Sequence, residues 1–200
     1  MNFKAIGFDY SGVIAGMSSA EFNSRVINLL NVEPQIFKEV YYKFNKLVNT
    51  NVLAPADFWK KILEELDAGN KYDELIKFIQ EIPIEIDEQV LGLVDQLKTN
   101  GYKAGLLSNN TLEAADGFKI TGLSNHFDVA LVSAEIGFSK PDPKAFQIFA
   151  ERLGVEVGEL IFIDDTEKSL STAKEVGYYP ILFTSYESLI EKLKSIGIRV

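Results

Sequence analysis

Five short aliphatic segments, each followed by small polar residues, alternate with helical segments, and this order constrains the fold more than any other feature of the sequence. The segments are Phe3 to Phe8, Tyr102 to Leu107, Val129 to Val132, Leu160 to Ile163 and Tyr179 to Phe183. They lack a strict alternation of apolar and polar residues, as is typical of strands covered on both faces. Strands that alternate with helices form parallel βαβ units. We therefore expect an α/β protein with a Rossmann-like, three-layer core and a parallel sheet.

The helices between the later strands are predicted from their end signals. Asp87 is placed to cap one helix, and Asp142-Pro143 opens another, because proline is favoured at the first helical position. Gly154 is typical of the residue that follows a helix. Two more helices are expected from Thr166 to Gly177 and from Ser185 to Ile196.

One long stretch, from about residue 18 to 81, breaks the alternation because it contains only helical patterns. Its first helix begins with the capping box Ser18-x-x-Glu21, and Pro34 opens the second. We expect a helical insertion of four-helix-bundle type over residues 16–82, with residues 1–15 and 83–200 forming the core. The insertion is rich in aromatic residues that could line a substrate pocket, although their helical spacing favours the core of the bundle. These residues are Tyr41, Tyr42, Phe58 and Trp59.

The absence of cysteine and the presence of a single histidine narrow the chemistry. Without cysteine the chain has no disulfides, thiolate zinc sites, iron-sulfur clusters or cysteine nucleophiles. A serine triad would depend on His126 alone, and this residue precedes a predicted strand, away from the strand ends where ligands bind. Catalysis is therefore expected to use carboxylates, hydroxyls, lysine or a bound hard metal ion.

The net charge of −9 and the pI near 4.7 argue against sequence-independent binding of nucleic acid. Such binding depends on Lys and Arg side chains that neutralise phosphates. No window approaches the roughly 18 apolar residues of a membrane-spanning helix. The apolar stretch from Ala5 to Phe8 is too short for a signal peptide, so we expect a cytoplasmic protein that does not bind membranes.

Polar side chains follow three of the predicted strands, where ligands bind in open α/β sheets. They are Asp9 and Ser11, Ser108 and Asn109, and Asp164 and Asp165. Lys140 lies in the loop after another strand. Each of these positions also has a local interpretation as a turn, a helix cap or a loop, but their joint order favours one shared site. Carboxylates gathered there would repel one another, which implies either raised pKa values or a bound cation. A hard divalent ion such as Mg²⁺ fits best, with Lys140 balancing charge when a phosphate enters.

Four short motifs occur in order along the chain: Phe8-Asp9-Tyr10-Ser11-Gly12-Val13-Ile14, Leu106-Leu107-Ser108-Asn109, Lys140-Pro141-Asp142-Pro143, and Ile163-Asp164-Asp165 followed by Ala173 and Gly177. In these motifs the chain resembles the haloacid dehalogenase-like (HAD) hydrolase superfamily. The resemblance spans the whole chain, because the helical insertion looks like the cap that follows the first motif in many members.

The resemblance implies roles for the residues of these motifs. Asp9 would be the nucleophile that forms an aspartyl-phosphate, and Ser11, Ser108 and Lys140 would complete the catalytic set. The expected substrate contacts are Gly12, Ser108, Asn109 and Lys140. Mg²⁺ would be held by Asp9, the backbone carbonyl of Ser11, and Asp164 or Asp165. Phosphoryl transfer asks mainly for positioning and charge neutralisation, which a metal ion and a lysine supply.

Ser11 departs from the family pattern, because phosphatases of the superfamily usually have an aspartate there as general acid and base. Serine has too high a pKa for this task, so we expect slow turnover or another proton donor. The predicted function is a Mg²⁺-dependent phosphatase of a small phosphorylated metabolite. A 2-haloacid dehalogenase, which also lacks that aspartate, is an alternative, but the Asp164-Asp165 pair favours the metal-dependent enzyme. A non-catalytic phosphate-binding or partner-binding protein is the second alternative.

Overall fold

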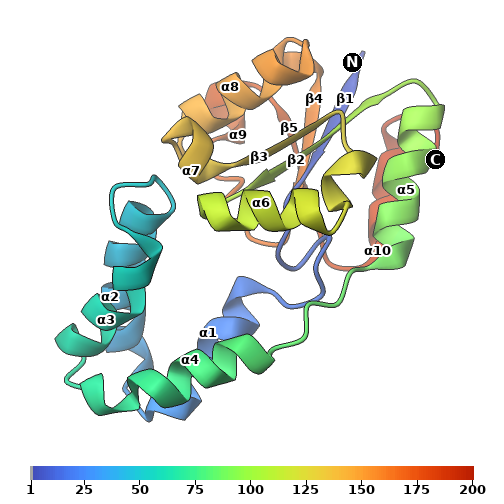
Figure 1. The fold of residues 1–200 in the computed structure, drawn as a ribbon. Helices are drawn as coiled ribbons and strands as arrows, with labels where there is room; N and C mark the ends of the chain where they lie inside the picture. Colours follow the sequence, from blue (N-terminus) through green and yellow to red (C-terminus); the bar gives the residue numbers. More distant parts are fainter. Residues whose placement is uncertain (1) are drawn as a thin grey trace.

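A computed structural model describes residues 2–200 and has a parallel five-stranded sheet at its centre (Figure 1). The strands are β1 (Ala5–Phe8), β2 (Lys103–Ser108), β3 (Val129–Val132), β4 (Leu160–Asp164) and β5 (Tyr179–Leu182). Their order in the sheet is β3-β2-β1-β4-β5, and every neighbouring pair is parallel. The predicted α/β class with a Rossmann-like parallel sheet is confirmed, and each predicted strand is present with small shifts at its ends.

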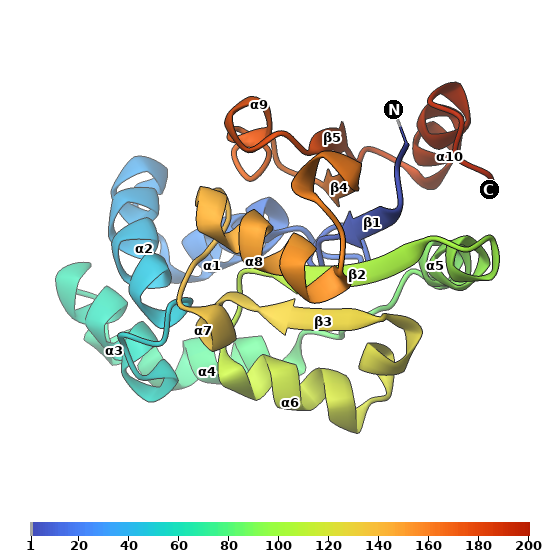
Figure 2. The same ribbon diagram turned by 90° about the horizontal axis from the view of Figure 1, so that it is seen from above.

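Strands β1 and β4 are apolar up to Asp164, the last residue of β4, because helices cover both faces of the sheet. All four residues of β1 and all five of β4 are buried. One face packs against α5 (Glu88–Thr99), α6 (Leu112–Ile120) and α10 (Tyr186–Ser195), and the other against α8 (Pro143–Leu153) and α9 (Ala173–Val176). The sheet between these two groups of helices is visible in Figures 1 and 2. This arrangement makes the three-layer core.

The capping signals account for where several helices begin. Asp87 accepts hydrogen bonds from the backbone N–H groups of Gln89 and Val90 at the start of α5. Asp142 accepts one from Lys144 at the start of α8, with Pro143 at the first helical position. The longest helix has 15 residues, and among residues 2–200 none combines the length and the apolar character needed to cross a bilayer.

One predicted helix start was wrong, and one predicted cap has only half of its expected hydrogen bonds, although its helix begins where predicted. The helix expected from Thr166 to Gly177 is limited to Ala173–Val176, and residues 167–172 form turns instead. The capping box at Ser18 is only half formed, because the carboxylate of Glu21 pairs with Arg25 instead of the Ser18 backbone. Helix α6, the short helix α7 (Ser133–Ile136) and the 3₁₀ turns η1 (Gly69–Lys71), η2 (Leu123–His126) and η3 (Val157–Glu159) were not predicted.

Four helices form the cap, which lies beside the sheet and has a hydrophobic core of its own (Figure 1). They are α1 (Ser19–Leu30), α2 (Pro34–Val48), α3 (Pro55–Glu65) and α4 (Tyr72–Glu81). Rings of Tyr41, Phe58 and Trp59 pack together there, with centroids 4.9 to 6.0 Å apart. Most of the aromatic residues therefore belong to the bundle core, as their spacing indicated.

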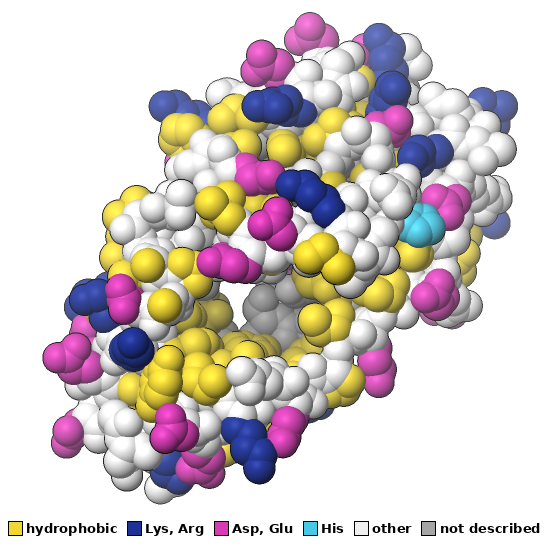
Figure 3. Space-filling model, in the orientation of Figure 1, with side chains coloured by type: hydrophobic (Ala, Val, Ile, Leu, Met, Phe, Trp, Pro, Cys, Tyr) yellow, Lys and Arg dark blue, Asp and Glu magenta, His cyan; other side chains and the backbone are white. Residues whose placement is uncertain are grey.

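Two linkers join the cap to the sheet and run side by side. Gly16 donates a backbone hydrogen bond to Glu85 (2.9 Å), and Asp87 donates one to Ile14 (2.9 Å). The domain limits that we propose, residues 16–82 for the cap and the remainder for the core, fall within these linkers. Figure 3 shows a hollow between the two parts, bordered by hydrophobic side chains.

Candidate active site

The three central strands bring the predicted site residues together at their carboxyl ends. Phe8, the last residue of β1, is paired with Leu106 on one side and Ile163 on the other. Asp9 follows Phe8 directly and donates its backbone N–H to the carbonyl of Ile163 (2.8 Å). Ser108 and Asp164, the last residues of β2 and β4, therefore flank Asp9.

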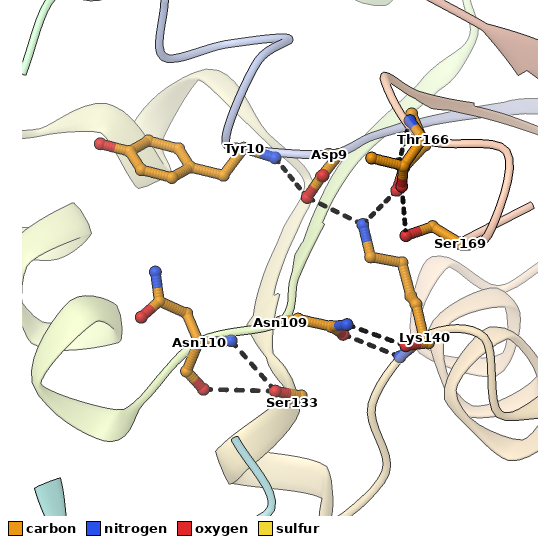
Figure 4. Close-up of polar contacts among 9 residues, drawn as sticks. Asp9, Tyr10, Asn109, Asn110, Ser133, Lys140, Thr166 and Ser169 are labelled. Carbon is orange, nitrogen blue, oxygen red and sulfur yellow. Dashed lines mark hydrogen bonds and ion pairs between the residues drawn. The ribbon is translucent and has the colours of Figure 1, made fainter. Parts of the chain in front are cut away.

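Lys140 reaches this point from the loop between α7 and α8. Its Nζ lies 2.8 Å from Oδ1 of Asp9 (Figure 4) and 2.6 Å from Oδ2 of Asp164. Its side chain is 1% exposed, and the Phe162 ring lies 4.9 Å from Nζ. Burial alone would lower the pKa of Lys140, but the carboxylates of Asp9 and Asp164 outweigh it and the pKa is raised. Lys140 is therefore a fixed positive charge between two carboxylates.

Asp9, Asp164 and Asp165 form an acidic cluster in which one oxygen of each lies within 4.8 Å of the others. Burial, opposed by Lys140 and reinforced by Asp164, raises the pKa of Asp9 to about 7. Burial and the neighbouring Asp164 raise the pKa of Asp165 to about 6. One lysine does not neutralise three carboxylates, so two of them hold protons more tightly than usual. Such an all-oxygen donor set with excess negative charge fits a hard divalent cation such as Mg²⁺.

The two adjacent aspartates have different surroundings. Asp164 is fully buried, and its Oδ1 accepts hydrogen bonds from the N–H (2.9 Å) and the hydroxyl (2.7 Å) of Thr166, while Oδ2 faces Lys140. Asp165 is only partly buried, and among residues 2–200 its carboxylate accepts no side-chain hydrogen bond. Of the two, Asp165 therefore has the oxygens that are free to bind a cation.

Gly12 is required where the first motif turns beneath Asp165. Its φ is +75°, a conformation that side chains rarely adopt, and a Cβ there would collide with the carboxyl oxygen Oδ2 of Asp165. Ser11 precedes it, and among residues 2–200 no backbone hydrogen bond uses the Ser11 carbonyl oxygen. Its role as a metal ligand stays a prediction that this geometry permits.

Asn109 holds the backbone of Lys140 rather than pointing freely into the site. Its Nδ2 donates to the Lys140 carbonyl (2.8 Å), and its Oδ1 accepts from the Lys140 N–H (2.7 Å; Figure 4). Thr172 adds a hydrogen bond to the next carbonyl, that of Pro141 (2.7 Å). The side chain of Asn109 thus positions Lys140, and its predicted contact with substrate stays a prediction. Ser108 is 2% exposed beside it.

His126 lies outside this site, as its position before a strand indicated. Its Nδ1 is 3.0 Å from Oδ1 of Asp95, and its carbonyl accepts a hydrogen bond from Lys98. These contacts lie at the amino end of β3, while Asp9 and Asp164 lie at the carboxyl ends of their strands.

The sequence reasoning did not find the residues that position the charged groups. These residues are Thr166, Thr172 and Asn109, the last of which was predicted only as a substrate contact. Thr166 is hydrogen-bonded to Asp164, Thr172 to the Pro141 carbonyl, and Asn109 to the backbone of Lys140. A threonine two residues after an aspartate commonly bonds to it locally, so the Asp164 to Thr166 spacing was a usable signal. The Thr172 to Pro141 bond joins segments 31 residues apart and had no local signal.

Comparison with known proteins finds a family and several relatives to which this chain is similar. The haloacid dehalogenase-like hydrolase family matches residues 3–177. Phosphatase MT3486 of Mycobacterium tuberculosis is 28% identical over 98% of this chain and 96% of its own length. The (S)-2-haloacid dehalogenase 4A of Burkholderia cepacia is 29% identical, over 62% of this chain and 57% of its own length.

Solved structures agree on the fold. A HAD family enzyme from Bacteroides thetaiotaomicron, crystallised as a magnesium complex, aligns with a TM-score of 0.70 over 95% of this chain and 99% of its own, at 21% identity. The family match covers most of the chain, from the first strand through the acidic cluster. With its parallel sheet and its carboxylates at the strand ends, the chain belongs to the haloacid dehalogenase-like hydrolase family.

Proposed function

We propose that this hydrolase is a Mg²⁺-dependent phosphatase that cleaves a small phosphorylated metabolite through an aspartyl-phosphate on Asp9. The observation that carries the proposal is the position of Lys140 Nζ between Asp9 and Asp164, with Asp165 completing an acidic cluster beside them. A lysine and a cation site next to a carboxylate nucleophile supply the charge neutralisation that a phosphoryl group needs. The likeness to Phosphatase MT3486 over nearly the full chain supports this reaction class.

Asp9 is oriented for attack by its hydrogen bonds. Its Oδ1 accepts from the backbone N–H of Tyr10 (2.7 Å) and from Lys140 Nζ (2.8 Å). Among the described residues no hydrogen bond occupies Oδ2. This oxygen would form the bond to phosphorus while the bond from phosphorus to the leaving oxygen breaks, and water would then release phosphate and regenerate the carboxylate.

The neighbouring residues would bind and orient the phosphoryl group. Lys140 would place its charge on a phosphoryl oxygen, and the Ser108 hydroxyl at the end of β2 would donate a hydrogen bond to another. Mg²⁺, held by Asp9, Asp165 and the Ser11 carbonyl, would supply further neutralisation of the phosphoryl charge when bound. The Bacteroides thetaiotaomicron neighbour was crystallised as a magnesium complex, which supports Mg²⁺ as the cation. Asp164 would keep Lys140 in place.

The test is a screen of phosphate release across phosphorylated metabolites, with Mg²⁺ and with EDTA. We expect at least one substrate to be turned over with Mg²⁺ and not with EDTA. Asp9→Asn removes the nucleophile and should abolish this release while circular dichroism shows a folded protein. Release by Asp9→Asn near the wild-type rate would contradict the proposed mechanism.

Ser11 supports a second candidate, a 2-haloacid dehalogenase, because the dehalogenation of a haloacid needs no acid at that position. The similarity to the Burkholderia cepacia dehalogenase agrees with it. Halide release from 2-haloacids in EDTA distinguishes the two. We expect none, since the acidic cluster of Asp9, Asp164 and Asp165 fits a cation that halide displacement does not use.

A further inference from the structure

Tyr42 and Lys168 make a contact between the cap and the core. Tyr42 lies on α2 and is 47% exposed, so its ring does not belong to the core of the bundle. Nζ of Lys168 lies 4.2 Å from the centroid of this ring. This distance is well within the range in which a cation is attracted to the face of an aromatic ring.

This contact stands apart from the other interactions of the cap. In the part of the chain that the structure describes, the hydrogen bonds, ion pairs and ring contacts of α1 to α4 are otherwise made within the cap. The cap is attached to the core by its two linkers, which are paired at Gly16 and Glu85. A hinge with few other attachments needs an additional contact to fix one position of the cap.

Lys168 belongs to the segment that carries the acidic cluster, three residues after Asp165. Thr166 and Ser169, on either side of Lys168, have hydroxyl oxygens 2.8 Å apart, and Thr166 is hydrogen-bonded to Asp164. The backbone at Lys168 is thus tied closely to the carboxylates. A contact of the cap with Lys168 therefore fixes the cap close to the acidic cluster.

We infer that Tyr42 and Lys168 are a positioning pair that holds the cap closed over the acidic cluster. A closed cap excludes water from the phosphoryl group and brings cap residues to the leaving group. The inference adds two residues outside the four motifs to the proposed phosphatase. Its kinetic consequence rests on the proposed function, whereas its structural consequence does not.

The structural test measures the separation of cap and core directly. The chain has no cysteine, so Val52→Cys in the cap and Ile120→Cys in α6, at positions 73% and 86% exposed, accept two spin labels without competing thiols. Pulsed electron spin resonance of this labelled pair should give one narrow distance distribution. Tyr42→Leu and Lys168→Gln should each add a longer distance, while Tyr42→Phe, which keeps the ring face, should not.

A matched control is Lys60→Gln, which removes a lysine that lies 6.0 Å from the Tyr72 ring within the cap. It should leave the distance distribution unchanged. Wild-type distributions in both Tyr42→Leu and Lys168→Gln would overturn the inference. So would a longer distance in Tyr42→Phe equal to that in Tyr42→Leu, because the ring face would then not be the binding element.

The kinetic test uses an aryl phosphate with Mg²⁺. Tyr42→Leu should lower kcat/KM by about two- to fivefold, the effect expected of one exposed cation–π contact, and Tyr42→Phe should restore it. The double variant Tyr42→Leu with Lys168→Gln should lose no more than either single variant, because both remove the same contact. Additive losses would contradict the pairing. If the wild type cleaves no phosphate ester, the proposed function fails, while the spin-label result still decides the inference.

Discussion

Lys140 and Asp164 form an ion pair in which Nζ and Oδ2 are 2.6 Å apart and both side chains are almost completely buried, at 1% and 0% exposed. Asp9 lies 2.8 Å from the same ammonium group, so one buried cation serves two carboxylates. Removing the cation leaves both carboxylates in a poorly solvated site. Both the stability of the protein and its proposed activity therefore depend on the side chain of Lys140.

We predict that Lys140→Met lowers the free energy of unfolding by about 3 to 5 kcal/mol at pH 8 in EDTA, since it leaves buried charges without a partner. The loss should be smaller at pH 5, where the carboxyls take up protons. Phosphatase activity should fall by at least about 10², as expected when a charge that stabilises the transition state is lost.

The control is Lys144→Met, four residues further on at an exposed position in α8. It should leave both urea unfolding and activity close to wild type. An equal loss of stability in the two variants would show that the buried pair is not the cause.

The raised pKa values of Asp9 and Asp165 predict that the metal-free protein becomes less stable as the pH rises. A carboxyl whose pKa is higher in the folded state stabilises the fold below its ordinary pKa of 3.8, and this contribution is lost as the pH passes the folded value, about 7 for Asp9 and about 6 for Asp165. Asp165→Asn should remove the part of this loss of stability that is due to Asp165. In EDTA it should exceed wild-type stability by about 1 to 3 kcal/mol at pH 8 and match it near pH 4.

Urea unfolding at pH 4 and pH 8 measures this difference, and Asp116→Asn, in an exposed residue of α6, is the control. Mg²⁺ should stabilise the wild type more than Asp165→Asn, because the variant loses a ligand. A variant that gains as much from Mg²⁺ as the wild type does would contradict the assignment of Asp165 to the cation site.

Gly12 and Gly137 offer a matched pair of substitutions, because their φ angles are +75° and +74° but their surroundings differ. A Cβ at Gly12 meets the carboxylate of Asp165, whereas a Cβ at Gly137 meets nothing within 4 Å. Both Gly→Ala variants should lose about 1 to 2 kcal/mol of stability from the backbone alone. Only Gly12→Ala should also displace Asp165 and weaken Mg²⁺ binding by calorimetry, and equal Mg²⁺ affinities in the two variants would argue against this contact.

Ser11 should limit turnover because it cannot act as a general acid or base. We expect faster cleavage of an aryl phosphate than of an alkyl phosphate of similar fit, since the aryl leaving group needs no proton. Ser11→Asp should raise the steady-state rate by up to the roughly 10²- to 10⁴-fold that general acid-base catalysis supplies. If Ser11→Asp binds Mg²⁺ normally and leaves the rate unchanged, proton transfer at this position is not the limiting step.

The parts of the fold that follow from local patterns could be predicted from the sequence. Strand β4 is continuously apolar from Leu160 to Ile163 because both its faces are covered, and α8 begins where Asp142 and Pro143 place it. The positions of Asp9 and Asp164 then followed from the rule that parallel strands end at one edge of the sheet.

What the sequence did not predict depends on contacts between distant segments. Asn109 is hydrogen-bonded to the backbone of Lys140, and Lys168 lies against the ring of Tyr42. Both contacts join residues that are far apart in the sequence and meet only in the folded chain. The local sequence also did not show that residues 167–172 form turns, since the bond from the Thr166 N–H to Asp164 is one that a helix cap makes as well.

The central claim, that Asp9 becomes phosphorylated, is tested most directly by acid-quenching the protein during turnover of a ³²P-labelled phosphoryl substrate with Mg²⁺ and mapping the label on its peptides. Because Ser11 cannot act as a general base, hydrolysis of the aspartyl-phosphate on Asp9 should be slow. The intermediate should then accumulate, so that label appears on the peptide containing Asp9. It should be absent from Asp9→Asn and should be removed by hydroxylamine, which cleaves acyl phosphates. Label on another residue, or phosphate release with label undiminished on Asp9→Asn, would contradict the account.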